Sequence, residues 1–314
     1  MLTPRDLRSV PLARRPLGQR LLADLYVRPT YLLRGVDIVV EGIERLLSPD
    51  PFIVAMNHTD RYNYFGLQVE LHRRHRRYLA SWVKGKYFEH WFSNWFMRTM
   101  SNIPVPSRGY LIAGHFKDRL GRAPTSDEYR VLRAILDGDH NHPLTDDLRD
   151  FVQGDPAGWA EHTEAEFEAL SREVVSLTGR ALTVGMGVLI FPEGTRSPHL
   201  LPGHGGIAQV AQHFGVPIIP VGCSGSIDVY PGDTPWPHRG RIVYRVGEPV
   251  LPEAEMQAPT GFEPLSRAAS RAHGDRFQAH VDRVMSDIAM LVDPRHRPLA
   301  EPVPSCTGGA DRFI

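Results

Sequence analysis

The 314-residue chain has few cysteines and no long hydrophobic run, and each of these absences excludes a class of protein. Its two cysteines, Cys223 and Cys306, lie far apart in sequence, so they form neither a disulfide framework nor a metal-binding spacing and fit a reducing cytoplasm. The longest apolar runs, such as 52–56 and 188–191, have the length of strands. About 20 apolar residues are needed to span a bilayer, so we expect any membrane contact to be at the surface.

An excess of charge of one sign is also missing. The chain has 36 Lys and Arg against 36 Asp and Glu, which argues against a nucleic-acid partner bound through net positive charge. Positive charge is instead local, in the first 34 residues and in the run His-Arg-Arg-His-Arg-Arg at 72–77. Such a run usually forms a solvated helix face, although beside a lipid site it could hold anionic head groups.

Several active-site signatures are absent as well. Residues 222–226 read Gly-Cys-Ser-Gly-Ser, which is not the Gly-x-Ser-x-Gly turn of a serine hydrolase. The glycines at 185–187 lack the third glycine of a dinucleotide-binding loop, and the chain has no Gly-Lys-Ser/Thr phosphate loop. The function therefore has to be sought in other segments.

The spacing of apolar residues predicts strands that alternate with helices. Strands are predicted at 36–41, 52–56, 78–83, 188–191, 216–222 and 241–246. Helices are predicted at 63–77, 91–100, 165–177, 207–214 and 277–291. This alternation is typical of an α/β fold with a mainly parallel central sheet flanked by helices. We predict one domain at 35–295, with an irregular or partly helical insertion at about 109–180.

The two ends and one aromatic segment need separate interpretation. Residues 1–34 form an N-terminal arm with apolar and arginine side chains at helical spacing, which predicts either a helix packed on the domain or an amphipathic helix on anionic lipid. Residues 296–314 are predicted to be a disordered tail. The aromatic stripe from Trp91 to Met100 is interpreted as core packing, with an acyl-chain wall or a membrane-facing ridge as the alternative.

Two polar segments follow predicted strands directly and carry the chemistry. Asn57-His58 comes after the strand at 52–56, and Phe-Pro-Glu-Gly-Thr-Arg-Ser at 191–197 follows the other apolar run. The carboxyl ends of parallel strands share one edge of a sheet, so we expect the two segments to meet. Histidine can accept a proton near neutral pH, a guanidinium matches a phosphate, and glycine allows close backbone approach. The pair suggests transfer onto a phosphate-bearing alcohol.

In this order, the segments resemble the motifs of the glycerolipid acyltransferase family, which includes the 1-acylglycerol-3-phosphate O-acyltransferases. The third motif of that family is complete at 191–197, and Asn57-His58 opens the first motif, Asn-His-x4-Asp. Ile-Pro-Val-Pro-Ser-Arg at 103–108 fits the second motif loosely, and Val-Pro-Ile-Ile-Pro-Val at 216–221 matches the fourth. The resemblance covers roughly residues 36–250, apart from the insertion.

The resemblance implies an O-acyltransferase that moves a fatty acyl group from a thioester, on coenzyme A or acyl carrier protein, to the hydroxyl of a lysophosphatidate-like acceptor. His58 would be the general base. The acceptor site would be lined by Arg108, Glu193, Gly194, Thr195 and Arg196. No metal and no cofactor other than the thioester co-substrate would be needed. We expect a peripheral enzyme on the cytoplasmic face of the cell membrane, with glycerol 3-phosphate or another lysolipid as alternative acceptors.

The first motif departs from the family pattern at its last position, where Asn63 replaces aspartate. Asn63 can still accept a hydrogen bond from the imidazole, or Asp60 can supply the charge, or the protein is a weak or inactive lipid-binding homologue. In a serine protease triad the same acid-to-amide change costs about 10⁴ in rate. A second departure follows the third motif, where Gly-His-Gly-Gly at 203–206 replaces the usual Phe-Lys-x-Gly.

Overall fold

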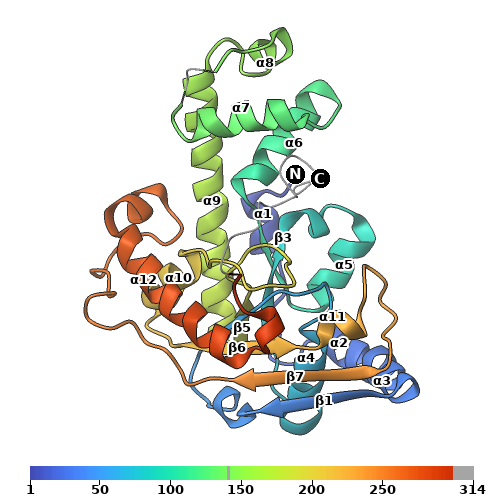
Figure 1. The fold of residues 1–314 in the computed structure, drawn as a ribbon. Helices are drawn as coiled ribbons and strands as arrows, with labels where there is room; N and C mark the ends of the chain where they lie inside the picture. Colours follow the sequence, from blue (N-terminus) through green and yellow to red (C-terminus); the bar gives the residue numbers. More distant parts are fainter. Residues whose placement is uncertain (140–141, 300–314) are drawn as a thin grey trace.

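The computed structural model describes residues 1–139 and 142–299, and within them one seven-stranded sheet forms the centre of the molecule (Figure 1). The strands are β1 (Val36–Glu41), β2 (Ile53–Met56), β3 (Leu79–Lys84), β4 (Ile103–Val105), β5 (Gly187–Ile190), β6 (Ile218–Ser224) and β7 (Gly240–Val246). Their spatial order is β1-β7-β6-β2-β5-β3-β4. Neighbouring strands are parallel except for the antiparallel pair of β6 and β7. The predicted α/β fold with a mainly parallel sheet is confirmed.

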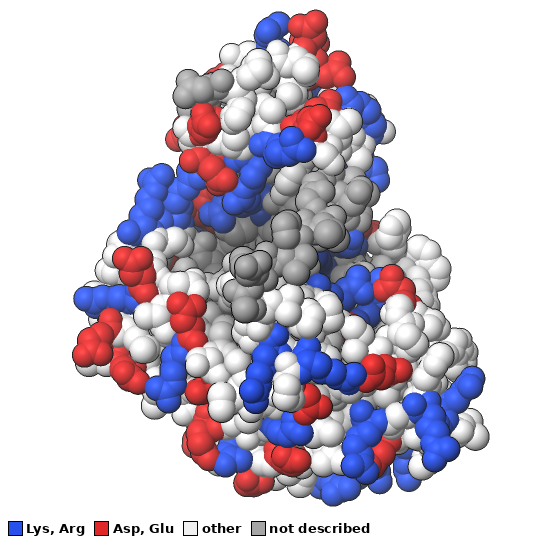
Figure 2. All heavy atoms as spheres, in the orientation of Figure 1, with Lys and Arg blue, Asp and Glu red and all other residues white. Residues whose placement is uncertain are grey.

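Helices cover both faces of this sheet, and the central strands β2, β5 and β6 are consequently buried along their whole length. One face packs against α9 (Pro156–Thr183), α10 (Gly206–Phe214) and α12 (Arg267–Leu291). The other packs against the π-helical turn η1 (Leu22–Val27), α3 (Arg28–Arg34) and α4 (Phe65–Glu70). Short elements also connect the strands and larger helices, namely α11 (Ser226–Val229), η2 (Ile43–Leu46), η3 (Leu71–His75), η4 (Gly85–Phe88) and η5 (Pro294–His296). Acidic and basic side chains are interspersed on the face drawn in Figure 2.

The N-terminal arm is packed on the domain and also presents apolar side chains outward. It consists of α1 (Pro4–Arg8), α2 (Leu17–Leu21), η1 and α3. The buried side-chain amide of Gln19 donates to the carbonyl oxygens of Leu79 at 2.8 Å and Met100 at 2.7 Å, which fixes α2 to the sheet. Leu25 and Leu33, in contrast, are exposed. The packing on the domain that the first interpretation expects is present, and contact of the outer side with anionic lipid stays a prediction.

The segment expected to be irregular or partly helical is folded mostly into helices. It contains α6 (Arg108–Leu120), α7 (Ser126–Leu136), α8 (Asp146–Phe151) and the N-terminal part of α9, which extends away from the sheet (Figure 1). These helices enclose a small core of their own, which includes Phe116, Leu132 and Phe151. The side chain of Thr125 accepts from the backbone N–H of Glu128, whose carboxylate accepts from the backbone N–H of Thr125. This capping box begins α7 and is visible in the sequence.

The interpretation of the aromatic stripe as core packing is wrong. The stripe lies on α5 (Trp91–Thr99), and its side chains of Trp91, Phe92 and Trp95 are 82%, 58% and 59% exposed. The inner side of the segment is made by Met97, which packs against the core, and by the buried Met100. The predicted disordered tail lies, from residue 300 onward, outside the described residues.

Candidate active site

The two motif loops lie side by side at the carboxyl edge of the sheet. Strands β2 and β5 are parallel neighbours, with Ala55 opposite Ile190, so the loops that follow them leave the sheet together. The backbone N–H of His58 donates to Oε1 of Glu193 at 2.7 Å, and the backbone N–H of Ser197 donates to the carbonyl oxygen of His58 at 2.8 Å. The structure thus brings together the two segments that the strand pattern places at one edge.

Asn57 clamps the start of the first loop to the neighbouring strand β6. Its side-chain Oδ1 accepts from the backbone N–H of Cys223 at 2.7 Å, and its Nδ2 donates to the carbonyl oxygen of Cys223 at 3.0 Å. The side-chain amide uses its oxygen as an acceptor and one N–H as a donor, so it pairs with β6 as a peptide group would. The residue before His58 is therefore fixed by the sheet.

The ring of His58 is oriented by Asn63. Nδ1 of His58 lies 3.3 Å from Oδ1 of Asn63, and Nδ2 of the buried Asn63 donates to the carbonyl oxygen of Asn57 at 2.7 Å. Because the amide nitrogen faces that carbonyl, the amide oxygen faces the imidazole, so Nδ1 carries the proton and Nε2 carries the lone pair. The ring also stacks on Phe191, with the ring centroids 4.0 Å apart. This tautomer is the one that a general base needs at Nε2.

The imidazole is neutral at neutral pH. The pKa of His58 is lowered to about 4, mainly by burial and also by the positive charges of Arg196 and Lys84, while the hydrogen bond that its Nδ1–H donates to Asn63 acts in the opposite direction. A general base must be unprotonated when the substrate binds. His58 meets this condition throughout the physiological pH range, although a low pKa also makes it a weak base.

Asp60, the alternative partner of the imidazole, is used elsewhere in the loop. Its Oδ1 accepts from the backbone N–H of Tyr62 and its Oδ2 from the hydroxyl of Thr59, both at 2.9 Å. Burial raises the pKa of this carboxyl group. Of the two partners considered for the imidazole, Asn63 is the one in contact with it, whereas Asp60 braces the turn that follows His58.

Glu193 connects the two loops from a buried position. Its Oε1 accepts from the N–H of His58, and its Oε2 accepts from the N–H of Leu201 at 3.0 Å. Burial raises the pKa of Glu193 to about 7, and the two backbone hydrogen bonds oppose this rise. Contact between Glu193 and an acceptor stays a prediction, and in this structure the carboxylate bonds the backbone of both loops.

The rest of the third motif reaches the surface. Gly194 adopts a φ of +65°, which favours glycine, and its N–H donates to the carbonyl oxygen of Phe191 at 3.1 Å to close the turn. Thr195 is half-buried and Arg196 is exposed. Nη1 of Arg196 lies 2.9 Å from Oδ1 of Asp233.

A second arginine reaches the same carboxylate: Nη2 of Arg61 lies 3.5 Å from Oδ1 of Asp233. The sequence interpretation did not select Arg61, although its place three residues after His58 in the first loop was an available signal. Guanidinium groups from both motif loops therefore meet at one carboxylate.

Arg108 is engaged in a different place. Its Nε lies 2.7 Å from Oε2 of Glu164 and its Nη2 lies 2.5 Å from Oε1, so the pair is bidentate. The guanidinium also lies over the ring of Phe167, 4.0 Å from its centroid. A role for Arg108 in acceptor binding stays a prediction.

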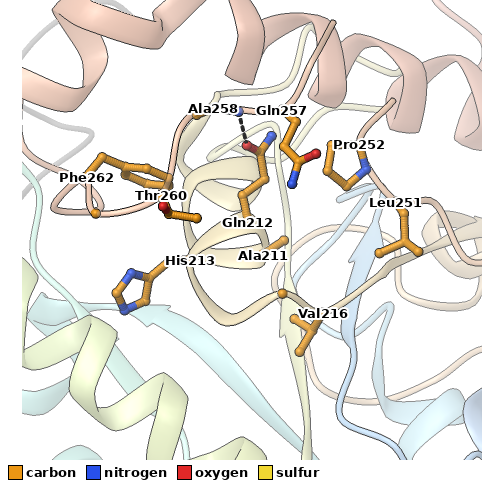
Figure 3. Close-up of a pocket in the computed structure, with 12 residues that line it drawn as sticks. Ala211, Gln212, His213, Val216, Leu251, Pro252, Gln257, Ala258, Thr260 and Phe262 are labelled. Atoms are coloured by element: carbon orange, nitrogen blue, oxygen red, sulfur yellow. Dashed lines mark hydrogen bonds between the residues drawn. The ribbon is translucent and has the colours of Figure 1, made fainter. Parts of the chain in front are cut away.

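A cavity of about 380 Å³ near the C-terminal end of α10 is remote from these loops (Figure 3). It is lined by residues such as Gln212, His213 and Phe262, with Oε1 of Gln212 accepting from the N–H of Ala258 at 2.9 Å. Val216, which also lines it, precedes β6, whereas the motif loops follow the parallel strands β2 and β5. The cavity therefore lies toward the opposite edge of the sheet. Across the described ranges, no group of three or more His, Cys, Asp and Glu residues is arranged to hold a metal ion.

Comparison with known proteins identifies the family to which this chain belongs. A model of the acyltransferase family matches residues 37–134 and 158–224, which is more than half of the chain and includes both motif loops. The chain belongs to the acyltransferase family, and it is an acyltransferase. The resemblance inferred from the motifs is confirmed at this level.

Among solved structures, the chain is similar to the 1-acyl-sn-glycerophosphate (LPA) acyltransferase PlsC from Thermotoga maritima. The TM-score is 0.42 at 19% sequence identity, over 83% of this chain and 78% of that one. No curated protein matches the sequence.

Proposed function

We propose that this enzyme transfers a fatty acyl group from a thioester to the free hydroxyl of a lysophosphatidate-like acceptor, with His58 as the general base. The observation that carries the proposal is the neutral imidazole, held through Nδ1 by Asn63, in the same pair of loops as the guanidinium of Arg196. One group removes a proton and the other attracts a phosphate, which is the combination that a phosphate-bearing alcohol requires.

The reaction follows from this arrangement. Nε2 of His58 takes the proton of the acceptor hydroxyl as its oxygen attacks the thioester carbonyl. The new C–O bond forms, the C–S bond breaks, and the departing thiolate takes the proton from the imidazolium. Oδ1 of Asn63 accepts the Nδ1–H throughout, but it carries no charge to stabilise the imidazolium. We therefore expect a working enzyme with modest turnover.

We propose that the enzyme acts at the cytoplasmic surface of the cell membrane, bound through its exposed apolar side chains. Helix α2 packs against α5, where Gly18 lies close to Thr99, so the exposed Leu17 and Leu21 of α2 and the aromatic stripe of α5 belong to neighbouring helices. Arg14, Arg15 and Arg20 are exposed beside them. Aromatic side chains with adjacent arginines favour an interface with anionic lipid. Within residues 1–139 and 142–299, no helix is long and apolar enough to cross a membrane.

The membrane proposal is tested by flotation with anionic vesicles. The double change Trp91→Ala and Trp95→Ala should reduce the bound fraction several-fold. Leu251→Ala, which removes an exposed apolar side chain near the remote cavity, serves as the matched control. Equal binding of the wild-type enzyme and both variants would contradict the proposed surface.

The catalytic proposal is tested with radiolabelled acyl-coenzyme A and acyl carrier protein against a panel of acceptors. The panel contains lysophosphatidate, glycerol 3-phosphate, a lysophosphatidylcholine and a phosphate-free monoacylglycerol. We expect the highest kcat/KM with lysophosphatidate, its loss in His58→Ala, and full activity in His213→Ala, a change at an exposed histidine near the remote cavity. Turnover that survives His58→Ala would rule out this base.

A further inference from the structure

One carboxylate at the rim of the site, that of Asp233, pairs with two arginines. Oδ1 of Asp233 lies 2.9 Å from Nη1 of Arg196 and 3.5 Å from Nη2 of Arg61. The side chains of Arg61 and Arg196 are each 42% exposed and that of Asp233 is 66% exposed, so the cluster is open to solvent. The hydrogen bond from Arg196 and the charge of Arg61 lower the pKa of Asp233, which is therefore ionised at neutral pH.

The charges of this cluster do not balance. Two guanidinium groups face one carboxylate, which leaves one positive charge beside the base. A phosphomonoester has three terminal oxygens and close to two negative charges at neutral pH, so it can satisfy two guanidinium forks at once. A carboxylate is therefore the weaker of the two anions that could occupy this position.

The Asp233 segment is held in place by its backbone. The hydroxyl of Tyr62 donates to the carbonyl oxygen of Asp233 at 3.0 Å, and the hydroxyl of Tyr26 donates to that of Pro235 at 2.7 Å. The ring of Tyr26 also contacts that of Trp236, with the ring centroids 5.9 Å apart. The Asp233 side chain can consequently rotate away from the arginines while the segment keeps its position.

We propose that Arg61 and Arg196 together bind the phosphomonoester of the acceptor, and that Asp233 is a placeholder which this phosphate displaces. The inference rests on the proposed function and adds Arg61 and Asp233 as residues that determine specificity. A phosphomonoester also occurs on the ribose of coenzyme A, so the experiment has to separate acceptor from donor.

The first test is calorimetric binding of glycerol 3-phosphate to the full-length protein, which requires no turnover. Asp233→Asn removes the competing charge and should tighten binding by about two- to five-fold, the range of exposed ion pairs. Arg61→Gln should weaken binding by roughly five-fold. Asp37→Asn, at an exposed pair with Arg241, should change nothing. Unchanged or weaker binding in Asp233→Asn, or unchanged binding in Arg61→Gln, overturns the proposal, as does absence of binding to the wild-type protein.

The second test is steady-state kinetics with lysophosphatidate and acyl-coenzyme A. Asp233→Asn should lower the KM for lysophosphatidate, and Arg61→Gln should raise it, while neither alters the KM for the thioester or for monoacylglycerol. A change confined to the thioester KM assigns the arginines to the donor and overturns the acceptor assignment. If the wild-type enzyme acylates monoacylglycerol as well as lysophosphatidate, the proposed function fails, whatever the calorimetry shows for Asp233.

Discussion

The replacement Asn63→Asp restores the residue usual in the family, yet the structure predicts that it is unfavourable here. Nδ2 of Asn63 donates to the carbonyl oxygen of Asn57, and the backbone carbonyl oxygen of Asn63 accepts from the hydroxyl of Tyr244, both at 2.7 Å. In Asn63→Asp a carboxylate oxygen would replace Nδ2, so two acceptors would face each other and the buried hydrogen bond to the carbonyl oxygen of Asn57 would be lost. Leaving a buried acceptor unpaired costs about 1–3 kcal/mol, so we expect the free energy of unfolding to fall by about that amount at neutral pH.

The pH dependence of this loss identifies its cause. Burial should raise the pKa of the introduced carboxyl group above its unfolded value. Between its unfolded and its folded pKa, the group binds more protons in the folded state than in the unfolded state. The loss in the free energy of unfolding relative to the wild-type protein therefore grows as the pH rises from the unfolded pKa to the folded pKa. Urea unfolding at pH 5 and pH 7.5 measures it. Asn94→Asp, where the new carboxylate faces Arg98, is a matched control that should cost little.

Turnover provides the second readout for Asn63→Asp. Because the loop is built around the amide, we expect no gain in kcat with lysophosphatidate. A faster enzyme with unchanged stability would refute the reasoning, since it would show that the loop accepts a carboxylate and that the amide had weakened the pair with His58.

Three further changes test other parts of the site. Because the pKa of His58 lies at about 4, kcat/KM should be flat from pH 6 to pH 8 and fall only toward pH 4; a midpoint near 6.5 would contradict the burial of the ring. Arg196→Ala should raise the acceptor KM by roughly five-fold and leave the thioester KM unchanged, since it removes one exposed ionic contact. The raised pKa of Glu193 makes the free energy of unfolding of the wild-type protein fall as the pH rises from 4.5 to 7, by about 3 kcal/mol at most. Glu193→Gln should remove this fall, and equal pH profiles of the two proteins in urea unfolding would refute the assignment.

The sheet and the meeting of the motif loops could be predicted because they depend on local patterns. Apolar runs without polar interruption indicate buried strands, and residues that follow parallel strands share one edge. Strand β4 was not predicted, because it contains Pro104 in a run of three residues. Proline is tolerated there since β4 is an edge strand.

Other features depend on contacts that sequence spacing does not contain. The period of the aromatic stripe defines one side of α5 but not which side faces the domain, so Trp91 could be assigned to the core by mistake. The meeting of Arg61 with Asp233 joins positions 172 residues apart. The helices of the insertion were hidden by its polar composition, although the capping box at Thr125 was a readable signal.

The clamp between Asn57 and β6 has a consequence for how the enzyme meets its substrate. The Asn57 side chain adds two hydrogen bonds to those that join β2 and β6. The backbone that carries His58 therefore loses its conformational freedom when the protein folds and not when substrate binds. The conformational entropy lost when substrate binds is then lost mainly at the exposed cluster of Arg61, Arg196 and Asp233, where the Asp233 side chain has to rotate away. We consequently expect the affinities of different acceptors to depend mainly on how well each one orders these three side chains, and little on how its hydroxyl reaches His58.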